Sequence, residues 1–170
     1  MPETPPTDGE LVTLAERVGA ALRDAGWCVA IAESCTGGWI AKCLTDVAGS
    51  SGWLECGLVT YSNRSKRALL GVEEQTLRRH GAVSEQAAAQ MARGVLAASA
   101  ADASVAVTGI AGPSGGSPEK PVGTVWLAWA RREGNVLTAS HHFAGDRDAV
   151  RRHSVGAALR GLLTLIADGR

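Results

Sequence analysis

Two short, mainly apolar segments constrain the fold of this chain more than any other feature. Residues 27–32 read Trp-Cys-Val-Ala-Ile-Ala, and residues 103–107 read Ala-Ser-Val-Ala-Val. Strands of this kind are typical of parallel sheets that helices cover on both faces. Each segment ends in a polar loop that contains glycine, at residues 33–38 and 108–116. The pattern therefore predicts an α/β fold.

The remaining segments predict the helices and the other strands. Apolar residues recur at helical spacing from Leu11 to Leu22, with Asp8 as the expected N-cap and Gly26 as the end. Helical spacing returns at residues 39–47, 63–71, 73–80, 84–101 and 146–166, while residues 58–61 predict a strand and residues 123–130 and 136–143 predict a hairpin. Parallel neighbours need crossover helices, so this order predicts a three-layer α/β/α domain with a mixed, largely parallel sheet.

Length and charge limit the domain organisation and the partners. The 170 residues fit one domain, which we expect at residues 10–170 after a flexible N-terminal tail at residues 1–9. The 17 basic residues balance the 17 acidic ones, so no net field attracts nucleic acid or an anionic membrane. The local cluster of Arg147, Arg151 and Arg152 fits a small anion better. A signal peptide and a membrane-spanning stretch are not evident, and we expect a cytoplasmic protein.

Cysteine and histidine spacing argues against a metal site. Four cysteines are separated by seven to thirteen positions, without the close pairs that metal ligands need: Cys28, Cys35, Cys43 and Cys56. His141 and His142 are adjacent in a predicted strand, so their side chains point to opposite faces. We therefore expect no metal and four structural thiols, of which Cys35 lies in a polar loop and is the one most open to reaction.

A serine and a lysine near residues 48–66 offer nucleophilic chemistry. Ser50 and Ser51 stand between glycines, and Lys66 follows the predicted strand at residues 58–61. A lysine in a dry cleft can lose its ammonium proton and then accept the proton of a serine hydroxyl. The spacing thus predicts a serine-lysine hydrolase, although a glycine-serine turn followed by a surface lysine would look the same. Ser34 competes for the same role.

Seven motifs that occur in one order resemble the CinA C-terminal domain family over residues 10–168. They are Ala-Glu-Ser-Cys-Thr-Gly-Gly at 32–38, Gly-Ser-Ser-Gly-Trp at 49–53, Val-Thr-Tyr-Ser-Asn-Arg-Ser-Lys at 59–66, Gly-Ala-Val-Ser-Glu at 81–85, Thr-Gly-Ile-Ala-Gly-Pro at 108–113, Lys-Pro-Val-Gly-Thr-Val at 120–125 and Gly-Asp-Arg at 145–147. The likeness is strongest to the stand-alone amidases of that family. It implies hydrolysis of nicotinamide mononucleotide to nicotinic acid mononucleotide and ammonia, in pyridine nucleotide salvage.

The resemblance also implies which residues form the site. It places the catalytic pair at Ser51 and Lys66, with Tyr61 to relay or orient the proton. The residues expected to bind substrate are Ser34, Thr36, Gly37, Gly38, Ser50, Thr108, Gly109, Gly112 and Arg147. Backbone N–H groups of residues 50–52 or 36–38 are the expected oxyanion donors. Arg147 and the loops at residues 37–38 and 109–116 are expected to hold the phosphate and ribose.

Each of these roles has a simpler explanation that the residues also allow. Ser50 can replace Ser51 as nucleophile, and we expect Ser34 to form a hydrogen bond rather than to attack. Tyr61 can be a core residue, Thr108 can merely end its strand, and Arg147 can pair with an aspartate, either Asp148 or Asp46.

The whole chain can also be something different from a specific amidase. It can be a nucleotide-binding module without catalysis, or an amidase of broader specificity. No dinucleotide-binding Gly-x-Gly-x-x-Gly motif occurs, and we expect no bound cofactor. Trp126 and Trp129 in the predicted hairpin suggest a buried surface or an intersubunit surface, and we expect a homo-oligomer.

Overall fold

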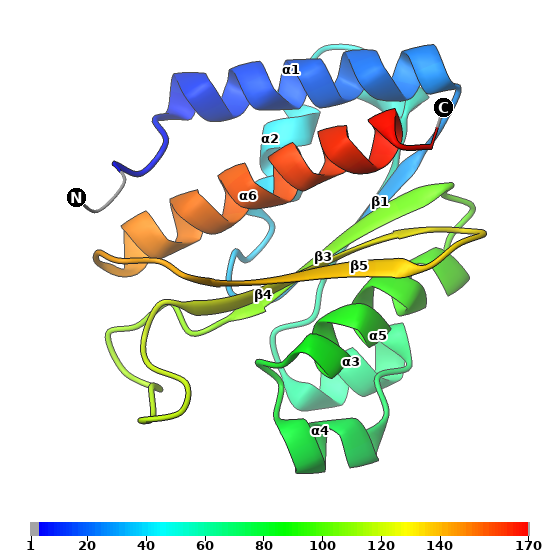
Figure 1. Ribbon diagram of the computed structural model, residues 1–170. Helices are drawn as coiled ribbons and strands as arrows, with labels where there is room; N and C mark the ends of the chain where they lie inside the picture. Colours follow the sequence, from blue (N-terminus) through cyan, green and yellow to red (C-terminus); the bar gives the residue numbers. More distant parts are fainter. Residues whose placement is uncertain (1–3, 170) are drawn as a thin grey trace.

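A central sheet lies between two layers of helices in the computed structural model, which describes residues 4–169 (Figure 1). The sheet has the strand order β2-β1-β3-β4-β5. Its strands are β1 (Val29–Glu33), β2 (Leu54–Val59), β3 (Ala103–Gly109), β4 (Thr124–Arg131) and β5 (Val136–His142). Strand β1 runs parallel to β2 and β3, whereas β4 is antiparallel to β3 and β5. The predicted three-layer α/β fold with a mixed sheet is confirmed.

The two faces of the sheet are covered by different helices (Figure 1). One face packs against α1 (Asp8–Ala25), α2 (Trp39–Thr45) and α6 (Arg147–Ala167), and the other against α3 (Asn63–Leu70), α4 (Glu74–His80) and α5 (Glu85–Ala97). Alternate residues of β1 enter the two hydrophobic clusters: Val29 and Ile31 on the α6 side, and Ala30 and Ala32 on the α5 side. Side chains of β1 are buried along its whole length, which explains its continuous apolar sequence.

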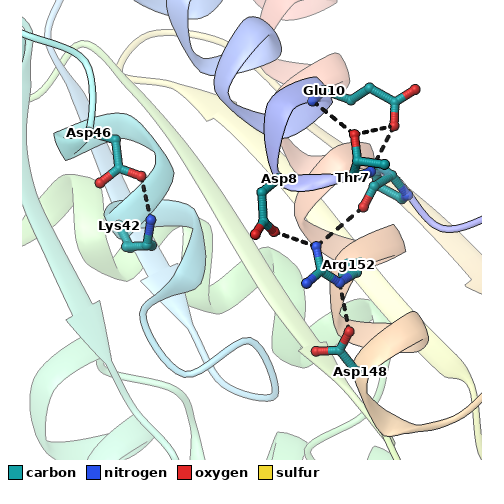
Figure 2. Close-up of polar contacts among 8 residues, drawn as sticks. Thr7, Asp8, Glu10, Lys42, Asp46, Asp148 and Arg152 are labelled. Atoms are coloured by element: carbon teal, nitrogen blue, oxygen red, sulfur yellow. Dashed lines mark hydrogen bonds and ion pairs between the residues drawn. The ribbon is translucent and has the colours of Figure 1, made fainter.

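The N-cap of helix α1 lies one residue earlier than predicted. Thr7, and not Asp8, is the N-cap: its hydroxyl accepts from the Glu10 N–H, and the Glu10 carboxylate accepts from the Thr7 N–H at 2.7 Å (Figure 2). Asp8 is the first helical residue, where an acidic side chain also suits the helix dipole. Residues 8–9 of the predicted flexible tail thus belong to α1, and residues 1–3 of that tail lie outside the described residues.

Strand β2 is longer than predicted and ends before Tyr61. It begins at Leu54, and its residues alternate between half-buried and exposed because it lies at an edge of the sheet. Glu55 and Gly57 interrupt its apolar character, so the sequence revealed only its last part. A one-turn helix, η1 (Ser50–Gly52), precedes β2, and Ser62 rather than Asn63 caps α3.

Trp129 of the hairpin is not part of a free surface, whereas Trp126 is half-buried. Trp129 is buried, and its indole N–H donates to the Ala158 carbonyl of α6 at 3.0 Å. Trp129 therefore no longer supports the prediction of a homo-oligomer, which stays a prediction. Within residues 4–169, none of the helices combines the length and the apolar character that crossing a membrane requires.

The two ends of strand β1 lie beside different segments of the chain. Glu33, at its carboxyl end, lies beside Val59, and the chain then leaves the sheet at residues 34 and 60. At its amino end the Val29 N–H donates to the Trp53 carbonyl, directly after η1. The loops at residues 34–38, 60–62 and 110–116 therefore lie together where strands β1, β2 and β3 end, which is called the carboxyl edge of the sheet below. The helix η1 lies at the opposite ends of β1 and β2.

Candidate functional site

A cleft of about 270 Å³ lies at the carboxyl edge of the sheet, between the ends of β1 and β3. Its walls come from five parts of the chain: residues 34–35 after β1, Tyr61 and Lys66 after β2, residues 82–83 before α5, most of residues 108–115, and Arg147 at the start of α6. Ligands of open α/β sheets bind at this edge, where neighbouring strands send their connections to opposite faces. The cleft is thus where the polar loops predicted from the sequence meet.

Two hollows near the start of α1 hold charges that are already paired. Arg152 donates to the carboxylates of Asp8 and Asp148, at 2.5 and 2.6 Å (Figure 2). Lys42 forms an ion pair with Asp46, one helical turn away. These ion pairs satisfy the charged side chains around the hollows. Arg152 is therefore not part of an anion-binding cluster, contrary to the expectation from its sequence position.

Lys66 reaches into the cleft from α3 and contacts Ser34. Its Nζ lies 2.9 Å from the Ser34 Oγ and donates to the Thr60 carbonyl at 2.6 Å. Ser62 and Ser65 cap the helix reciprocally, and long side chains near a helix start point back toward that end. Lys66 is only 1% exposed, and burial lowers the pKa of its ammonium group. The positive end of the α3 dipole opposes the charged form as well.

No carboxylate of residues 4–169 forms an ion pair with Lys66. Its two polar partners are a hydroxyl and a carbonyl, which can hydrogen-bond to a neutral amine. When the amine is neutral, the same contact lets the Ser34 hydroxyl donate to the nitrogen lone pair. The geometry is that of a nucleophile beside its base.

Ser51 does not lie near Lys66, so the structure does not bring the predicted catalytic pair together. Ser50 and Ser51 are in η1, at the amino ends of β1 and β2. The length of β2, roughly 20 Å at about 3.3 Å per residue, separates this helix from Thr60. Ser51 is also exposed. In the sequence Ser51 precedes strand β2 and Lys66 follows it, so the two residues lie at opposite ends of that strand.

The Glu33 carboxylate occupies the anion-binding position at the start of α2, which the sequence suggested for a phosphate of the substrate. Its carboxylate is 1% exposed and accepts from the Thr36 hydroxyl at 2.5 Å. It also accepts from three N–H groups at the start of α2, those of Gly38, Ile40 and Ala41, at 2.9 to 3.2 Å. These donors offset the cost of burying the charge.

The predicted phosphate loop at residues 37–38 is therefore already satisfied within the protein. The Gly37 N–H donates to the Ser34 carbonyl at 3.0 Å, and the Gly38 N–H is held by Glu33. Thr36 is completely buried, and its hydroxyl is bound to Glu33. Neither glycine lines the cleft. These three residues shape the turn after Ser34, and the structure gives no support to their binding substrate through these groups.

Cys35 lines the cleft next to Ser34 but is not a second nucleophile. It is 5% exposed, and burial together with the nearby Glu33 carboxylate raises the pKa of its thiol to about 12. The thiolate that reacts with electrophiles is therefore scarce at neutral pH. The expectation that Cys35 would be the reactive cysteine is not supported.

Arg147 and Tyr61 form one wall of the cleft. The Arg147 guanidinium donates to the Tyr61 hydroxyl at 3.0 Å and to the Gly112 carbonyl at 2.7 Å. Tyr61 is 61% exposed, which rules out a core position for its side chain. Asp148 and Asp46, the two aspartates that the sequence offered as partners of Arg147, pair with Arg152 and Lys42 instead.

Thr108 and the glycines after it set the opposite wall. The Thr108 hydroxyl is buried and donates to the Ala82 carbonyl at 2.8 Å, which links β3 to the segment before α5. Gly109 has no room for a side chain, since a Cβ there would lie 2.7 Å from Val125 and 3.2 Å from the Cys35 sulfur. Gly112 has φ +83°, a backbone conformation that favours glycine.

The sequence reasoning missed the role of Glu33 and gave Arg151 only as part of a basic cluster for a small anion. Glu33 follows a buried strand directly and precedes a glycine-rich helix start, and a carboxylate at that position signals an internal helix cap. Arg151 lies one helical turn after Arg147, a spacing that places both on the same side of α6. Its guanidinium donates to the carbonyls of Cys35 and Thr36.

Comparison with known proteins identifies the family of this chain. The model of the CinA C-terminal domain family matches residues 11–166. The chain belongs to this family. The nicotinamide-nucleotide amidohydrolase PncC of Escherichia coli strain K12 is 56% identical over 156 residues, which cover 92% of this chain and 94% of that protein. The protein of the same name from Pseudomonas putida is 54% identical and covers 91% of this chain and 96% of its own length.

Solved structures of CinA proteins share the fold. The crystal structure of the competence/damage inducible protein CihA from Agrobacterium tumefaciens matches with a TM-score of 0.90 at 48% identity. The match covers 96% of this chain and 98% of that one. The resemblance to the CinA C-terminal domain family found in the sequence motifs is thus confirmed along nearly the whole chain.

Proposed function

We propose that this protein is a nicotinamide-nucleotide amidase in which Ser34 is the nucleophile and Lys66 the general base. The observation that carries the mechanism is the 2.9 Å contact between the Lys66 Nζ and the Ser34 Oγ inside the cleft. The substrate class rests on the two PncC amidohydrolases that are more than half identical over nine-tenths of the chain.

The reaction starts with the neutral amine of Lys66. The Ser34 oxygen attacks the carboxamide carbon of nicotinamide mononucleotide while Lys66 accepts the hydroxyl proton. The carbon–nitrogen bond then breaks, and the Lys66 ammonium gives the proton to the departing nitrogen, which leaves as ammonia. Water repeats the sequence on the acyl-enzyme and releases nicotinic acid mononucleotide. The product is suited to pyridine nucleotide salvage.

The oxyanion of the tetrahedral intermediate needs donors beside Ser34. In the described chain, the N–H groups of Cys35 and Thr36 are not taken up by an acceptor of another residue. They belong to the turn that follows the nucleophile, the position from which serine hydrolases commonly supply such donors. We assign the oxyanion to this turn. This proposal does not use the donors expected at residues 50–52, because η1 lies at the opposite end of strand β2 from Lys66.

Arg147 is the proposed phosphate ligand. It is the arginine that lines the cleft, and a guanidinium binds phosphate through two parallel hydrogen bonds. Its present partners, the Tyr61 hydroxyl and the Gly112 carbonyl, hold it at the rim. In this proposal Tyr61 orients Arg147 and the ribose.

Two serine variants test the mechanism. Ser34→Ala removes the nucleophile, so ammonia release from nicotinamide mononucleotide falls to background while the melting temperature stays close to wild type. Ser51→Ala is the matched control, and it keeps full activity because that side chain is exposed and at the other edge of the sheet. An active Ser34→Ala variant, or an inactive Ser51→Ala variant that folds, contradicts the assignment.

Substrate comparisons separate the competing functions. A nucleotide-binding module is stabilised by nicotinamide mononucleotide in a thermal melt but releases no ammonia. A broad amidase hydrolyses nicotinamide and simple amides at comparable rates. The proposed enzyme prefers the mononucleotide over the riboside, which lacks the phosphate.

A further inference from the structure

The turn after Ser34 is held from outside by an arginine that does not line the cleft. Arg151 donates through its Nε to the Cys35 carbonyl at 3.1 Å and through Nη2 to the Thr36 carbonyl at 3.0 Å. Its guanidinium lies 5.1 Å from the centre of the Trp39 ring, which is the first residue of α2. The side chain thereby connects α6 to the segment between β1 and α2.

The planar peptide bond turns these two contacts into a constraint on the N–H groups. In a trans peptide the C=O and the following N–H point in opposite directions. With the Cys35 carbonyl fixed toward Arg151, the Thr36 N–H must point away from Arg151. With the Thr36 carbonyl fixed in the same way, the Gly37 N–H is directed to the Ser34 carbonyl, as observed at 3.0 Å.

The fixed turn keeps two N–H groups free. In residues 4–169, the N–H groups of Cys35 and Thr36 meet no acceptor of another residue. Cys35 lines the cleft, whereas Thr36 is completely buried and does not line it. Cys35 is therefore the residue of this turn that can offer its N–H to a substrate in the cleft, directly after the nucleophile.

We propose that Arg151 is a positioning residue for amide hydrolysis, which holds the Cys35 and Thr36 carbonyls and so fixes the turn that offers the Cys35 N–H as an oxyanion donor beside Ser34. This proposal rests on the proposed function, since it assumes that Ser34 attacks a carbonyl or an equivalent centre. Arg151 does not touch the substrate in this proposal. It acts through the two carbonyls that it holds from the side of α6.

The chain offers a matched control in the next residue. Arg152 also lies over the Trp39 ring, at 4.9 Å, but its guanidinium pairs with Asp8 and Asp148 and makes no contact with the turn (Figure 2). Replacing Arg152 therefore removes an arginine stacked on Trp39 and two ion pairs, and it leaves the Cys35 and Thr36 carbonyls bound. The comparison separates orientation of the turn from support of the helix.

Kinetics with nicotinamide mononucleotide give the first test. We expect Arg151→Met to lower kcat on the order of 10- to 100-fold, as small displacements of catalytic groups do, with KM within about threefold of wild type. Arg151→Lys keeps the charge but has no rigid fork for two carbonyls, and its kcat lies between the two. Arg152→Met lowers the melting temperature and leaves kcat unchanged.

A second readout follows Ser34 directly and does not depend on the natural substrate. A fluorophosphonate probe reacts as the Ser34 Oγ forms a bond to phosphorus, fluoride leaves, and the serine proton passes to Lys66. The phosphoryl oxygen then occupies the oxyanion position. The labelling rate of Arg151→Met should fall by about the same factor as kcat, whereas labelling of Arg152→Met matches wild type.

The outcomes distinguish this proposal from the proposed function. If Arg151→Met keeps the wild-type kcat and labelling rate while Ser34→Ala is inactive, Arg151 has no positioning role and the amidase assignment stands. Equal losses in the Arg151 and Arg152 variants also overturn the positioning role, because a general effect on α6 would then explain both losses.

If wild type releases no ammonia but is labelled in an Arg151-dependent way, only the substrate assignment fails. If Arg151→Met does not fold, Arg151→Lys decides, and wild-type kinetics in that variant refute the need for the fork. A wild type that is neither active nor labelled removes both proposals.

Discussion

Replacing Lys66 by methionine should abolish activity and yet make the protein more stable at neutral pH. Methionine has nearly the same length and volume, and it fills a site that is 1% exposed. The variant lacks the amine that accepts the Ser34 proton. It also lacks the group whose burial opposes folding, since burial lowers the pKa of Lys66 from its ordinary 10.5.

The magnitude is set by two opposing contributions. Each pH unit between the depressed folded pKa of a buried lysine and its ordinary 10.5 costs about 1.4 kcal/mol of folding free energy. Methionine removes this cost but loses the two hydrogen bonds of Nζ and leaves the Thr60 carbonyl unpaired, which together cost about 3 to 4 kcal/mol. We expect a net gain at pH 7 because the proposed mechanism needs a neutral Lys66 there, and each kcal/mol of gain raises the melting temperature of a chain of this size by about 2 to 4 °C.

The sign of the pH dependence provides a sharper check. Because the folded pKa of Lys66 is depressed, the unfolded chain binds more protons between that pKa and 10.5, and wild-type stability rises with pH through this window. The advantage of Lys66→Met should therefore shrink as the pH rises and reverse before pH 10.5, where the hydrogen bonds lost with Nζ outweigh the remaining cost of burying the lysine. The acid limb of kcat/KM in wild type reports the same deprotonation.

Thermal or urea unfolding at pH 7 and pH 10, together with ammonia release, measures both effects. Lys42→Met is the matched control, because Lys42 is exposed and paired with Asp46 in an ordinary surface ion pair. It keeps its activity and changes stability by less than about 1 kcal/mol at either pH. Lys66→Met that loses several kcal/mol at pH 7, or that still releases ammonia near neutral pH, would refute the neutral-lysine reasoning.

Two further variants test the frame around the pair. Glu33→Gln removes the buried charge and turns an amide N–H₂ toward backbone donors. We therefore expect urea unfolding to show a free energy of unfolding lower by about 2 to 3 kcal/mol, together with a lower kcat. Wild-type stability in this variant would contradict the internal cap. Gly94→Ala, in α5, places a Cβ 1.9 Å from the Leu70 carbonyl oxygen, so α3 must shift. We expect the free energy of unfolding to fall by more than about 2 kcal/mol and the activity to be reduced, although residue 94 is outside the cleft. A stable and fully active variant would show that the two helices adjust freely.

The elements of the fold were predictable because their signals are local. Buried strands β1 and β3 show continuous apolar sequence, and Ser84 and Asp146 cap α5 and α6 as predicted. The caps of α1 and α3 were off by one residue, since Thr7 and Ser62 stand next to other good capping residues. Neighbouring cap candidates differ little in free energy until the reciprocal partner, at the third helical residue, is considered.

The catalytic pair was only half predictable. Lys66 was found because a lysine after a strand is unusual near polar loops, but its partner depends on the register of β2 against β1. Pairing of Glu33 with Val59 brings residue 34 to the lysine and sends Ser51 to the other edge. Ser34 was weighed as a competitor and assigned a lesser role. Spacing along a chain cannot distinguish serines at the two ends of one strand, whereas strand register does.

The internal carboxylate of Glu33 has a consequence for inhibitor selectivity. A covalently attached anion holds the amide groups at the start of α2 at a local concentration that no dissolved sulfate, phosphate or nucleotide can match. Crystallisation salts and cellular polyphosphates are therefore shut out of that position. Compounds that imitate a phosphate must compete at the opposite rim, beside Arg147, and potency gained there should transfer little to proteins whose phosphate cradle is a helix start.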